Sequence, residues 1–271
     1  MIEFQKLTRT YGDFTAVQPL SLTVQRGEVF GFLGPNGAGK TTTIRMMMGI
    51  LVPSGGRALI SGLDCHSERA EVQRHVGYLP DNPIYYDFLR GREILEFVGE
   101  MHGLTRAEAR ERANRLIDDF GLDEAGEEFA VNYSMGMKKR LGLACALIHD
   151  PPVLILDEPT NALDPRASRE VQQRLRKSAA EGRTILLSTH LLDMAERLCT
   201  RVGIIHKGVL VSVGSLAELK AQVAEGGSIE EVFLKVTEPD EEGWGAEAPA
   251  PAQTPTPTPT PTPGPPADRA T

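Results

Sequence analysis

The sequence predicts an α/β fold built on a largely parallel β-sheet, and two observations support this. Short apolar and β-branched runs alternate along the chain with segments of helical periodicity, which is typical of βαβ units. The 271 residues are 41% hydrophobic and 24% charged, which suits a globular protein with a large core. The runs that we interpret as strands are residues 22–24, 29–33, 153–156 and 184–188.

The charge and the cysteine content of the chain disfavour several classes of protein. With 29 Lys and Arg against 37 Asp and Glu, the net charge is −8, which gives no electrostatic reason to approach nucleic acid. Cys65, Cys145 and Cys199 have neither zinc-site spacing nor the even count of a disulfide framework. The sequence shows no secretory signal and no apolar run long enough to span a bilayer. We therefore expect a cytoplasmic chain whose membrane role would require a separate subunit.

Between residues 82 and 150 the pattern is almost purely helical, and we interpret this segment as a subdomain inserted between two strands. Its clearest helix spans residues 105–120, where Thr105 and Glu108 form a capping box and Gly121 is the stop. The predicted apolar face of this helix consists of Ala109, Ala113, Leu116, Ile117 and Phe120.

The segment after Gly214 contains two predicted short helices, within about residues 215–236. Their capping boxes are Ser215 with Glu218 and Ser228 with Glu231. Residues 237–271 are acidic and then rich in Thr and Pro, and alternate residues of 254–264 lack a backbone N–H. We expect a disordered, solvated tail there, and a docking role is the alternative.

A glycine-rich segment, GPNGAGKT at residues 34–41, lies directly after the apolar run 29–33 and directly before a helical pattern, which is the context that a P-loop requires. Glycines let backbone N–H groups face phosphate oxygens, Lys40 reaches the β and γ phosphates, and Thr41 offers a hydroxyl to Mg²⁺. An ordinary glycine-rich turn is the alternative. The predicted nucleotide-binding residues of this loop are Gly34, Pro35, Asn36, Gly37, Ala38, Gly39, Lys40, Thr41 and Thr42.

Two further strand ends carry candidate catalytic residues. Asp157 and Glu158 follow the apolar run 153–156, so that Asp157 is placed to bind Mg²⁺ and Glu158 to deprotonate a water that attacks the γ phosphate. An exposed acid pair is the alternative, which the P-loop disfavours. His190 ends the third run and is placed to sense the γ phosphate, with Glu158 as its partner. The other histidines have no such setting and are interpreted as structural.

These elements, in this order, resemble an ABC ATPase, specifically the ATP-binding subunit of an ABC transporter, over residues 1 to about 236. The resemblance implies a P-loop NTPase core, ATP and Mg²⁺ as ligands, and a small antiparallel β region near the N-terminus. Residues 133–137, YSMGM, resemble the signature motif of the family. The resemblance implies a head-to-tail homodimer in which Ser134 and Gly136 of one copy close over the γ phosphate bound by the other.

Three other positions match the family. Tyr11 resembles the aromatic residue that stacks on adenine, and a core aromatic is the alternative. Residues 161–164 resemble the D-loop at the dimer interface, with Asp164 as a helix N-cap before Pro165. His190 resembles the switch histidine.

The sequence departs from the family pattern at two places. Asp81 occupies the position of a glutamine that contacts Mg²⁺, and because Asp is shorter its contact with the metal could run through water. Met135 and Met137 replace the commoner glycine and glutamine of the signature. Ser134 and Gly136, the anion-facing pair, are present.

The resemblance implies an ATPase that drives export of a drug, lipid, polysaccharide or antibiotic through separate membrane subunits, from the inner face of the cell membrane. Residues 82–88, with Tyr85, Tyr86 and Phe88, could receive such a subunit, and core packing is the alternative.

A soluble ABC ATPase acting on the ribosome or on DNA is the alternative function. Such proteins usually carry two ATPase units, long coiled-coil inserts or zinc modules, and the only compact basic cluster here, Lys138–Arg140, belongs to the signature helix. A nucleotide-binding module without turnover is disfavoured by the presence of Lys40, Asp157, Glu158 and His190.

Overall fold

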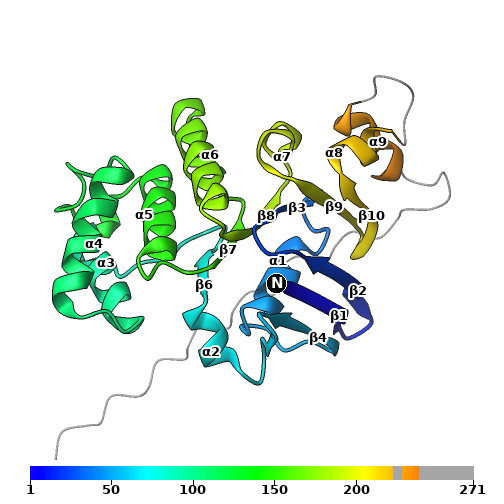
Figure 1. Cartoon of the computed structure of the whole chain (residues 1–271), viewed down its shortest axis with the longest axis horizontal. Helices are drawn as coiled ribbons and strands as arrows, with labels where there is room; N and C mark the ends of the chain where they lie inside the picture. The colour runs from blue at the N-terminus through cyan, green and yellow to red at the C-terminus, as the bar shows by residue number, and fades with distance from the viewer. Residues whose placement is uncertain (222–227, 238–271) are drawn as a thin grey trace, which may run out of the picture. The chain divides into compact units, whose positions relative to one another are not determined.

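The fold is centred on a six-stranded sheet, described here from a computed structural model that covers residues 1–221 and 228–237 (Figure 1). The strand order is β10-β9-β3-β8-β7-β6, and every neighbouring pair is parallel except β9 and β10. The predicted, largely parallel α/β sheet is therefore confirmed. Its strands are β3 (Val29–Leu33), β6 (Val76–Leu79), β7 (Val153–Asp157), β8 (Thr184–Thr189), β9 (Arg201–His206) and β10 (Val209–Ser215).

A second, four-stranded antiparallel sheet has the order β2-β1-β4-β5 and contains the N-terminus, as the family resemblance implied. The sequence indicated only residues 22–24 of this sheet, because β1 mixes polar and apolar residues and its pairing with β2 shifts register three times. Its strands are β1 (Ile2–Tyr11), β2 (Phe14–Val24), β4 (Gly55–Ile60) and β5 (Leu63–Asp64).

Both faces of the six-stranded sheet are covered, which explains why its central strands are continuous apolar runs. One face packs against helices α6 (Pro165–Ala180) and α7 (Leu192–Leu198). The opposite face packs against α1 (Lys40–Met47) and the antiparallel sheet, and the rings of Phe4, Phe30 and Phe32 meet there. This arrangement holds the carboxyl ends of β3, β7 and β8 at one edge. The short helix α2 (Arg69–Arg74) leads into β6.

Helices α3 (Gly91–Met101), α4 (Arg106–Asp119) and α5 (Met135–Leu147) gather beside β6, with the 3₁₀ turn η1 (Ala130–Asn132) between α4 and α5 (Figure 1). The capping box that begins α4 is confirmed: the Thr105 hydroxyl accepts from the Glu108 N–H at 3.3 Å, and the Glu108 carboxylate accepts from the Thr105 N–H at 2.8 Å. Residues 82–150 form one isolated β-bridge and no strand. The boundaries of a separate subdomain there stay a prediction.

The last two described helices are α8 (Leu216–Lys220) and α9 (Ile229–Thr237). The capping box of Ser215 and Glu218 is confirmed, and the Ser228 hydroxyl accepts from the Glu231 N–H at 3.2 Å. The predicted disordered, solvated tail lies outside the described residues, except for Thr237, which ends α9. Among the described helices, none is long and apolar enough to cross a membrane. Cys65, Cys145 and Cys199 are free thiols.

Two histidines that the sequence left as structural form a stacked pair. His102 follows α3 and His149 follows α5, and their ring centroids are 3.7 Å apart with the planes 6° from parallel. Both ring nitrogens of His149 are buried. Burial, followed by the charge of His102, lowers the pKa of His149 from 6.5 to about 4. The folded chain therefore holds this imidazole neutral at neutral pH.

The stacked pair should make the folded chain lose stability as the pH falls from 6.5 toward 4. Between these values the unfolded chain binds more protons at residue 149 than the folded chain does, so acid favours unfolding. His149→Phe, which keeps a ring against His102, should remove about 1–3 kcal/mol of this pH-dependent loss in urea unfolding. His66→Leu, a change at an exposed imidazole, is the matched control. Equal pH profiles for the His149→Phe chain and the unchanged chain would contradict the assignment.

Candidate nucleotide-binding site

The glycine-rich loop connects β3 to α1, and its backbone conformation requires glycine. Gly37 and Gly39 have φ angles of 78° and 105°, in the left-handed region that other residues rarely adopt. A Cβ on Gly39 would lie 2.7 Å from the Ala16 carbonyl oxygen, and one on Gly34 would lie 2.4 Å from that of Ile205. The chain therefore passes too close to its neighbours for any side chain at these two positions.

This loop forms one wall of a cavity of about 260 Å³. The cavity combines the predicted phosphate loop, the predicted adenine-stacking residue and two of the predicted acids. Its lining residues are Tyr11, Phe14, Ala16, Pro35, Asn36, Gly37, Ala38, Gly39, Lys40, Thr41, Thr42, Asp81 and Glu158.

Tyr11 and Phe14 lie at the mouth of the cavity, with exposed fractions of 46% and 61%. Tyr11 is therefore not a core aromatic, and the Arg9 guanidinium lies 4.4 Å from its ring centroid. Phe14 was missed by the sequence reasoning. Tyr11 and Phe14 pair across the β1–β2 turn, so the intervening Gly-Asp turn signal could have indicated two aromatic residues at one place.

The ammonium group of Lys40 lies at the base of the loop. It donates to the carbonyl oxygens of Gly34 at 2.6 Å and Pro35 at 3.2 Å, and it is 3.6 Å from Glu158 Oε1. Burial lowers the pKa of Lys40, and the negative charge of Glu158 opposes that effect. Lys40 and Glu158 are thus brought together from positions 118 residues apart in the sequence.

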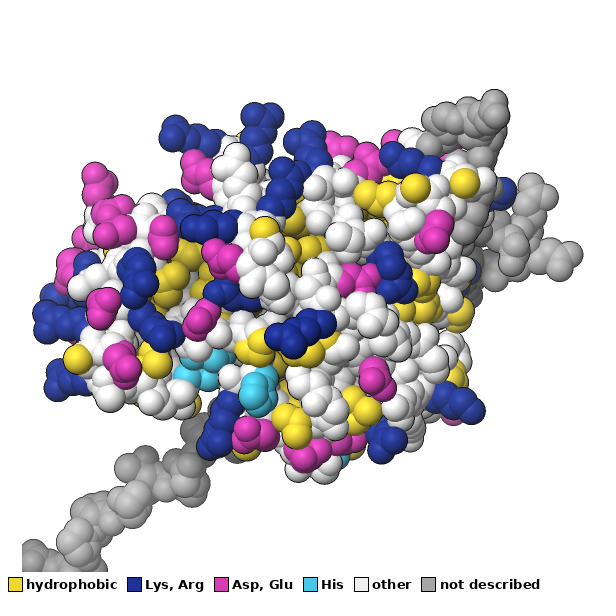
Figure 2. Space-filling view, viewed as in Figure 1, with side chains coloured by type: hydrophobic (Ala, Val, Ile, Leu, Met, Phe, Trp, Pro, Cys, Tyr) yellow, Lys and Arg dark blue, Asp and Glu magenta, His cyan; other side chains and the backbone are white. Residues whose placement is uncertain are grey.

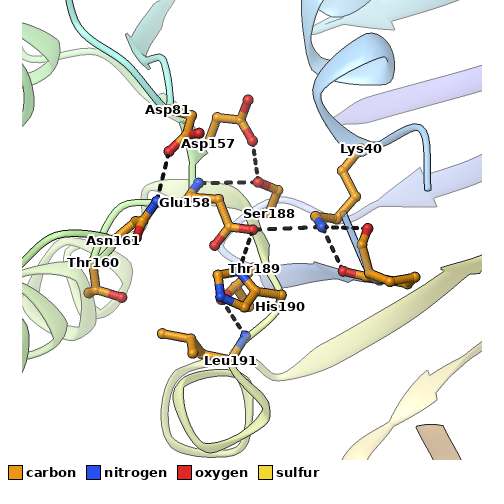
Figure 3. A network of polar contacts seen from close by, with 12 residues as sticks. Lys40, Asp81, Asp157, Glu158, Thr160, Asn161, Ser188, Thr189, His190 and Leu191 are labelled. Carbon is orange, nitrogen blue, oxygen red and sulfur yellow. Dashed lines mark hydrogen bonds and ion pairs between the residues drawn. The ribbon is translucent and has the colours of Figure 1, made fainter. Parts of the chain in front are cut away.

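Asp157, at the end of β7, is completely buried. Ser188 on the adjacent strand β8 donates its hydroxyl hydrogen to Asp157 Oδ1 and accepts from the Glu158 N–H at 3.2 Å (Figure 3). The other carboxylate oxygen, Oδ2, has no hydrogen bond to the described part of the chain. A buried, unpaired carboxylate oxygen is unfavourable unless a cation binds it, and Mg²⁺ prefers oxygen ligands. Asp157 therefore fits Mg²⁺, and Thr41 offers a second oxygen at the cavity wall.

Glu158 has a φ of 47°, a strained value for a residue other than glycine. Its Oε1 lies 3.0 Å from His190 Nδ1 as well as 3.6 Å from Lys40 Nζ (Figure 3). The expected contact between Glu158 and His190 is therefore present. One carboxylate oxygen is shared between a lysine from the phosphate loop and a histidine from the end of β8.

Asp81 follows β6 at the edge of the cavity, where its Oδ1 accepts from Asn161 Nδ2 at 3.3 Å. Lys139 lies on the other side, with its Nζ 2.6 Å from the Asp81 carbonyl oxygen and 3.5 Å from Oδ1. The basic cluster Lys138–Arg140 lies in α5, as expected, and its middle side chain, Lys139, is only 1% exposed. No local pattern of residues indicates its burial.

Four of the predicted nucleotide-binding residues do not line the cavity: Gly34, Ser134, Gly136 and Asp164. Ser134 is exposed and caps α5, since its hydroxyl accepts from the Met137 N–H at 3.2 Å. Asp164 is the N-cap of α6 and accepts from two backbone N–H groups. A Cβ on Gly136 would lie 3.4 Å from the Ala162 carbonyl oxygen, so the N-terminus of α5 and residues 161–164 adjoin.

The aromatic residues of 82–88 divide between core and surface. Tyr85 donates its hydroxyl hydrogen to the Lys138 carbonyl oxygen at 2.9 Å and packs against the core, so the alternative of core packing was correct for this residue. Core packing was wrong for Tyr86 and Phe88, whose side chains are 68% and 82% exposed. Ile84 is 92% exposed beside them.

A P-loop between strand and helix, with an acid at the end of another strand of the same sheet, defines a P-loop nucleotide-binding protein. The sequence pattern of the family described as ABC transporter matches residues 17–161. The chain belongs to this family and carries its ATPase domain.

Individual relatives agree with this assignment. The chain is 40% identical to the uncharacterised ABC transporter ATP-binding protein YhcH of Bacillus subtilis, over 89% of this chain and 77% of that protein. It is 37% identical to the probable multidrug ABC transporter ATP-binding protein YbhF of Escherichia coli over 87% of this chain, which spans only 41% of that relative. A solved ATP-binding subunit of an ABC transporter, 32% identical, matches 87% of this chain and 99% of its own with a TM-score of 0.81.

The unpaired carboxylate oxygen of Asp157 should lower the free energy of unfolding of the chain. Asp157→Asn removes a buried negative charge beside Glu158 and keeps an oxygen for Ser188, so it should raise the free energy of unfolding by about 1–3 kcal/mol without Mg²⁺ or nucleotide. It should also abolish the further stabilisation that Mg²⁺ with ATP confers. Urea unfolding under both conditions measures these effects.

Asp193→Asn, at a side chain that is 89% exposed, is the control and should change stability by less than about 0.5 kcal/mol. An Asp157→Asn chain that is less stable than the unchanged chain without Mg²⁺ would show that the carboxylate is held for structural reasons.

Proposed function

We propose that the chain binds and hydrolyses ATP as the ATP-binding subunit of an export-type ABC transporter. One observation carries the proposal: the cavity is lined by the P-loop from Pro35 to Thr42 and by two acids, whereas the second expected anion site, at Ser134 and Gly136, lies outside it. A single chain therefore holds two complementary parts of a nucleotide site that it does not bring together.

The residues of the cavity, together with Asp157 and His190, suit hydrolysis of a triphosphate. Lys40 and the N–H groups of the loop would bind the phosphates, and Asp157 and Thr41 would hold Mg²⁺, which neutralises phosphate charge when bound. Glu158 would accept a proton from the attacking water. His190, 3.0 Å from Glu158 and 41% exposed on its side chain, would orient that carboxylate and contact the γ phosphate.

The exposed N-terminus of α5 supports a head-to-tail homodimer. Its free N–H groups and the positive end of the helix dipole favour an anion, and α5 is long enough for this effect. Ser134 and Gly136 of one copy would face the γ phosphate in the other copy. Asn161 to Asp164 adjoin this surface and would lie at the interface.

Glu158→Gln should bind ATP and lower the rate of hydrolysis by about 10²–10⁴-fold, because the general base is lost while the charge-independent contacts stay. ATP should then accumulate in a dimer that size-exclusion chromatography detects with Mg-ATP. Glu124→Gln, at an exposed acid on another surface, is the matched control and should hydrolyse ATP at the unchanged rate.

Adding Gly136→Asp to the Glu158→Gln chain tests the arrangement of the dimer. The new carboxylate would repel the partner's phosphates, so the dimer should disappear while ATP still binds each monomer. Wild-type turnover by Glu158→Gln would remove Glu158 from its role, and an intact dimer in the double variant would remove Gly136 from the interface.

The membrane subunit is expected at an apolar patch formed by Ile84, Tyr86, Phe88, Phe97 and Met101. Their exposed fractions run from 44% to 92%, and the rings of Tyr86 and Phe97 meet edge to face at 6.2 Å. Exposed apolar residues that cluster in this way mark interaction surfaces. The name of the Escherichia coli relative, probable multidrug ABC transporter ATP-binding protein, supports a drug-like compound as the transported substance. We propose that it is exported, with the chain at the inner face of the cell membrane.

The distribution of charged side chains on the surface disfavours the alternative function, action on the ribosome or on DNA. Over helices α3 to α5, Lys and Arg side chains are interspersed with Asp and Glu in the view of Figure 2. Lys139 cannot contribute to a basic surface because it is buried. Electrostatic attraction to phosphate backbones requires a face of one sign, which this view does not present.

Phe88→Asp should reduce the fraction of the chain that sediments with membranes of its native cells by at least about tenfold, while ATP hydrolysis by the purified chain stays unchanged. Ile50→Asp, at an exposed apolar residue outside the patch, is the control and should sediment normally. The same loss in both variants would show that the apolar patch is not the docking surface.

A further inference from the structure

The ammonium group of Lys139 is buried and is surrounded by hydrogen-bond acceptors. It lies on α5 with 1% of its surface exposed, and its Nζ is surrounded by four oxygens of two strand ends. The distances are 2.6 Å to the Asp81 carbonyl, 3.3 Å to the Asp157 carbonyl, and 3.5 Å each to the Pro80 carbonyl and Asp81 Oδ1. An ammonium group has three donors and no acceptor, so these oxygens match its charged form.

A buried ammonium ion requires a negative counter-charge. The three carbonyl oxygens carry only partial charges, and the nearest carboxylate oxygen is Asp81 Oδ1. Asp81 itself is 40% exposed on its side chain, and Asn161 donates to the same oxygen at 3.3 Å. Asp81 thus has two donors from the protein that fix its carboxylate, from α5 and from the loop after β7.

We infer that Asp81 is the counter-ion of Lys139, and that Lys139 is a positioning residue that fixes the N-terminus of α5 relative to Asp157 and Glu158. The ammonium group bridges the ends of β6 and β7, and its helix carries Ser134 and Gly136 at its N-terminus. A movement of α5 must either carry both strand ends with it or break these hydrogen bonds.

The ion pair of Asp81 and Lys139 also explains why a third acid can lie beside a site for a triphosphate. Asp157, Glu158 and Asp81 would together give the cavity edge three negative charges against Lys40 alone, and Lys139 offsets the third. In this role Asp81 is not a direct ligand of Mg²⁺, which revises the expectation from the sequence. The inference rests on the proposed function only where hydrolysis is measured.

A double-mutant cycle on the full chain tests the pair by urea unfolding without Mg²⁺ or nucleotide. Asp81→Asn should lower the folding equilibrium constant by at least about fivefold when Lys139 is present, since the ammonium loses its counter-charge. In the Lys139→Met background the same change should have an effect below about twofold. Equal effects of Asp81→Asn in both backgrounds would overturn the inference. If Lys139→Met does not fold, Lys139→Gln replaces it in the cycle.

Hydrolysis tests the positioning role. Lys139→Met should lower kcat at least about tenfold and change KM for Mg-ATP less than about threefold, and Lys139→Arg should recover most of kcat. Asp81→Asn should leave the Mg²⁺ concentration for half-maximal hydrolysis within about twofold. A tenfold increase in that concentration, or a loss in KM alone for Lys139→Met, would overturn the inference. If the unchanged chain hydrolyses no ATP, the proposed function fails, and the unfolding cycle still decides on the pair.

Discussion

The site depends on burying like charges at the carboxyl ends of parallel strands. Asp157 and Glu158 follow one another on the chain, and in low dielectric surroundings their repulsion is strong unless cations oppose it. Lys40 opposes it from the phosphate loop, Ser188 satisfies one oxygen of Asp157, and the second oxygen of Asp157 has no partner among the described residues. The backbone strain at Glu158 shows how firmly the surrounding structure holds this arrangement.

The parts of this site that the sequence predicted are those with local signals. The P-loop, the strand ends and the capping boxes of α4 and α8 each depend on residues a few positions apart, and the structure contains all of them. The contact of Glu158 with His190 was also anticipated, because residues at the ends of neighbouring parallel strands meet at one edge. Nucleotide and Mg²⁺ contacts of individual residues stay predictions.

The features of the site that the sequence did not predict depend on packing between segments that are distant in the chain. Lys139 belongs to a run of three basic residues, which is typical of an exposed surface. Its burial follows only from the way α5 lies across the ends of β6 and β7. Tyr85 and Tyr86 are neighbours with opposite environments, since one side chain reaches the core and the other does not. Phe14 enters the cavity through a hairpin whose first strand had weak periodicity.

The order of strands in the central sheet has a consequence for biosynthesis. β8 lies between β3 and β7, so the strand that carries the P-loop and the strand that carries Asp157 are joined into one sheet only after Thr184–Thr189 is made. A nascent chain that stops earlier leaves both edges of β3 and one edge of β7 unpaired, a state prone to aggregation. Translation must therefore pass about two thirds of the chain before the catalytic edge can close, and chaperones have their strongest reason to bind in that interval.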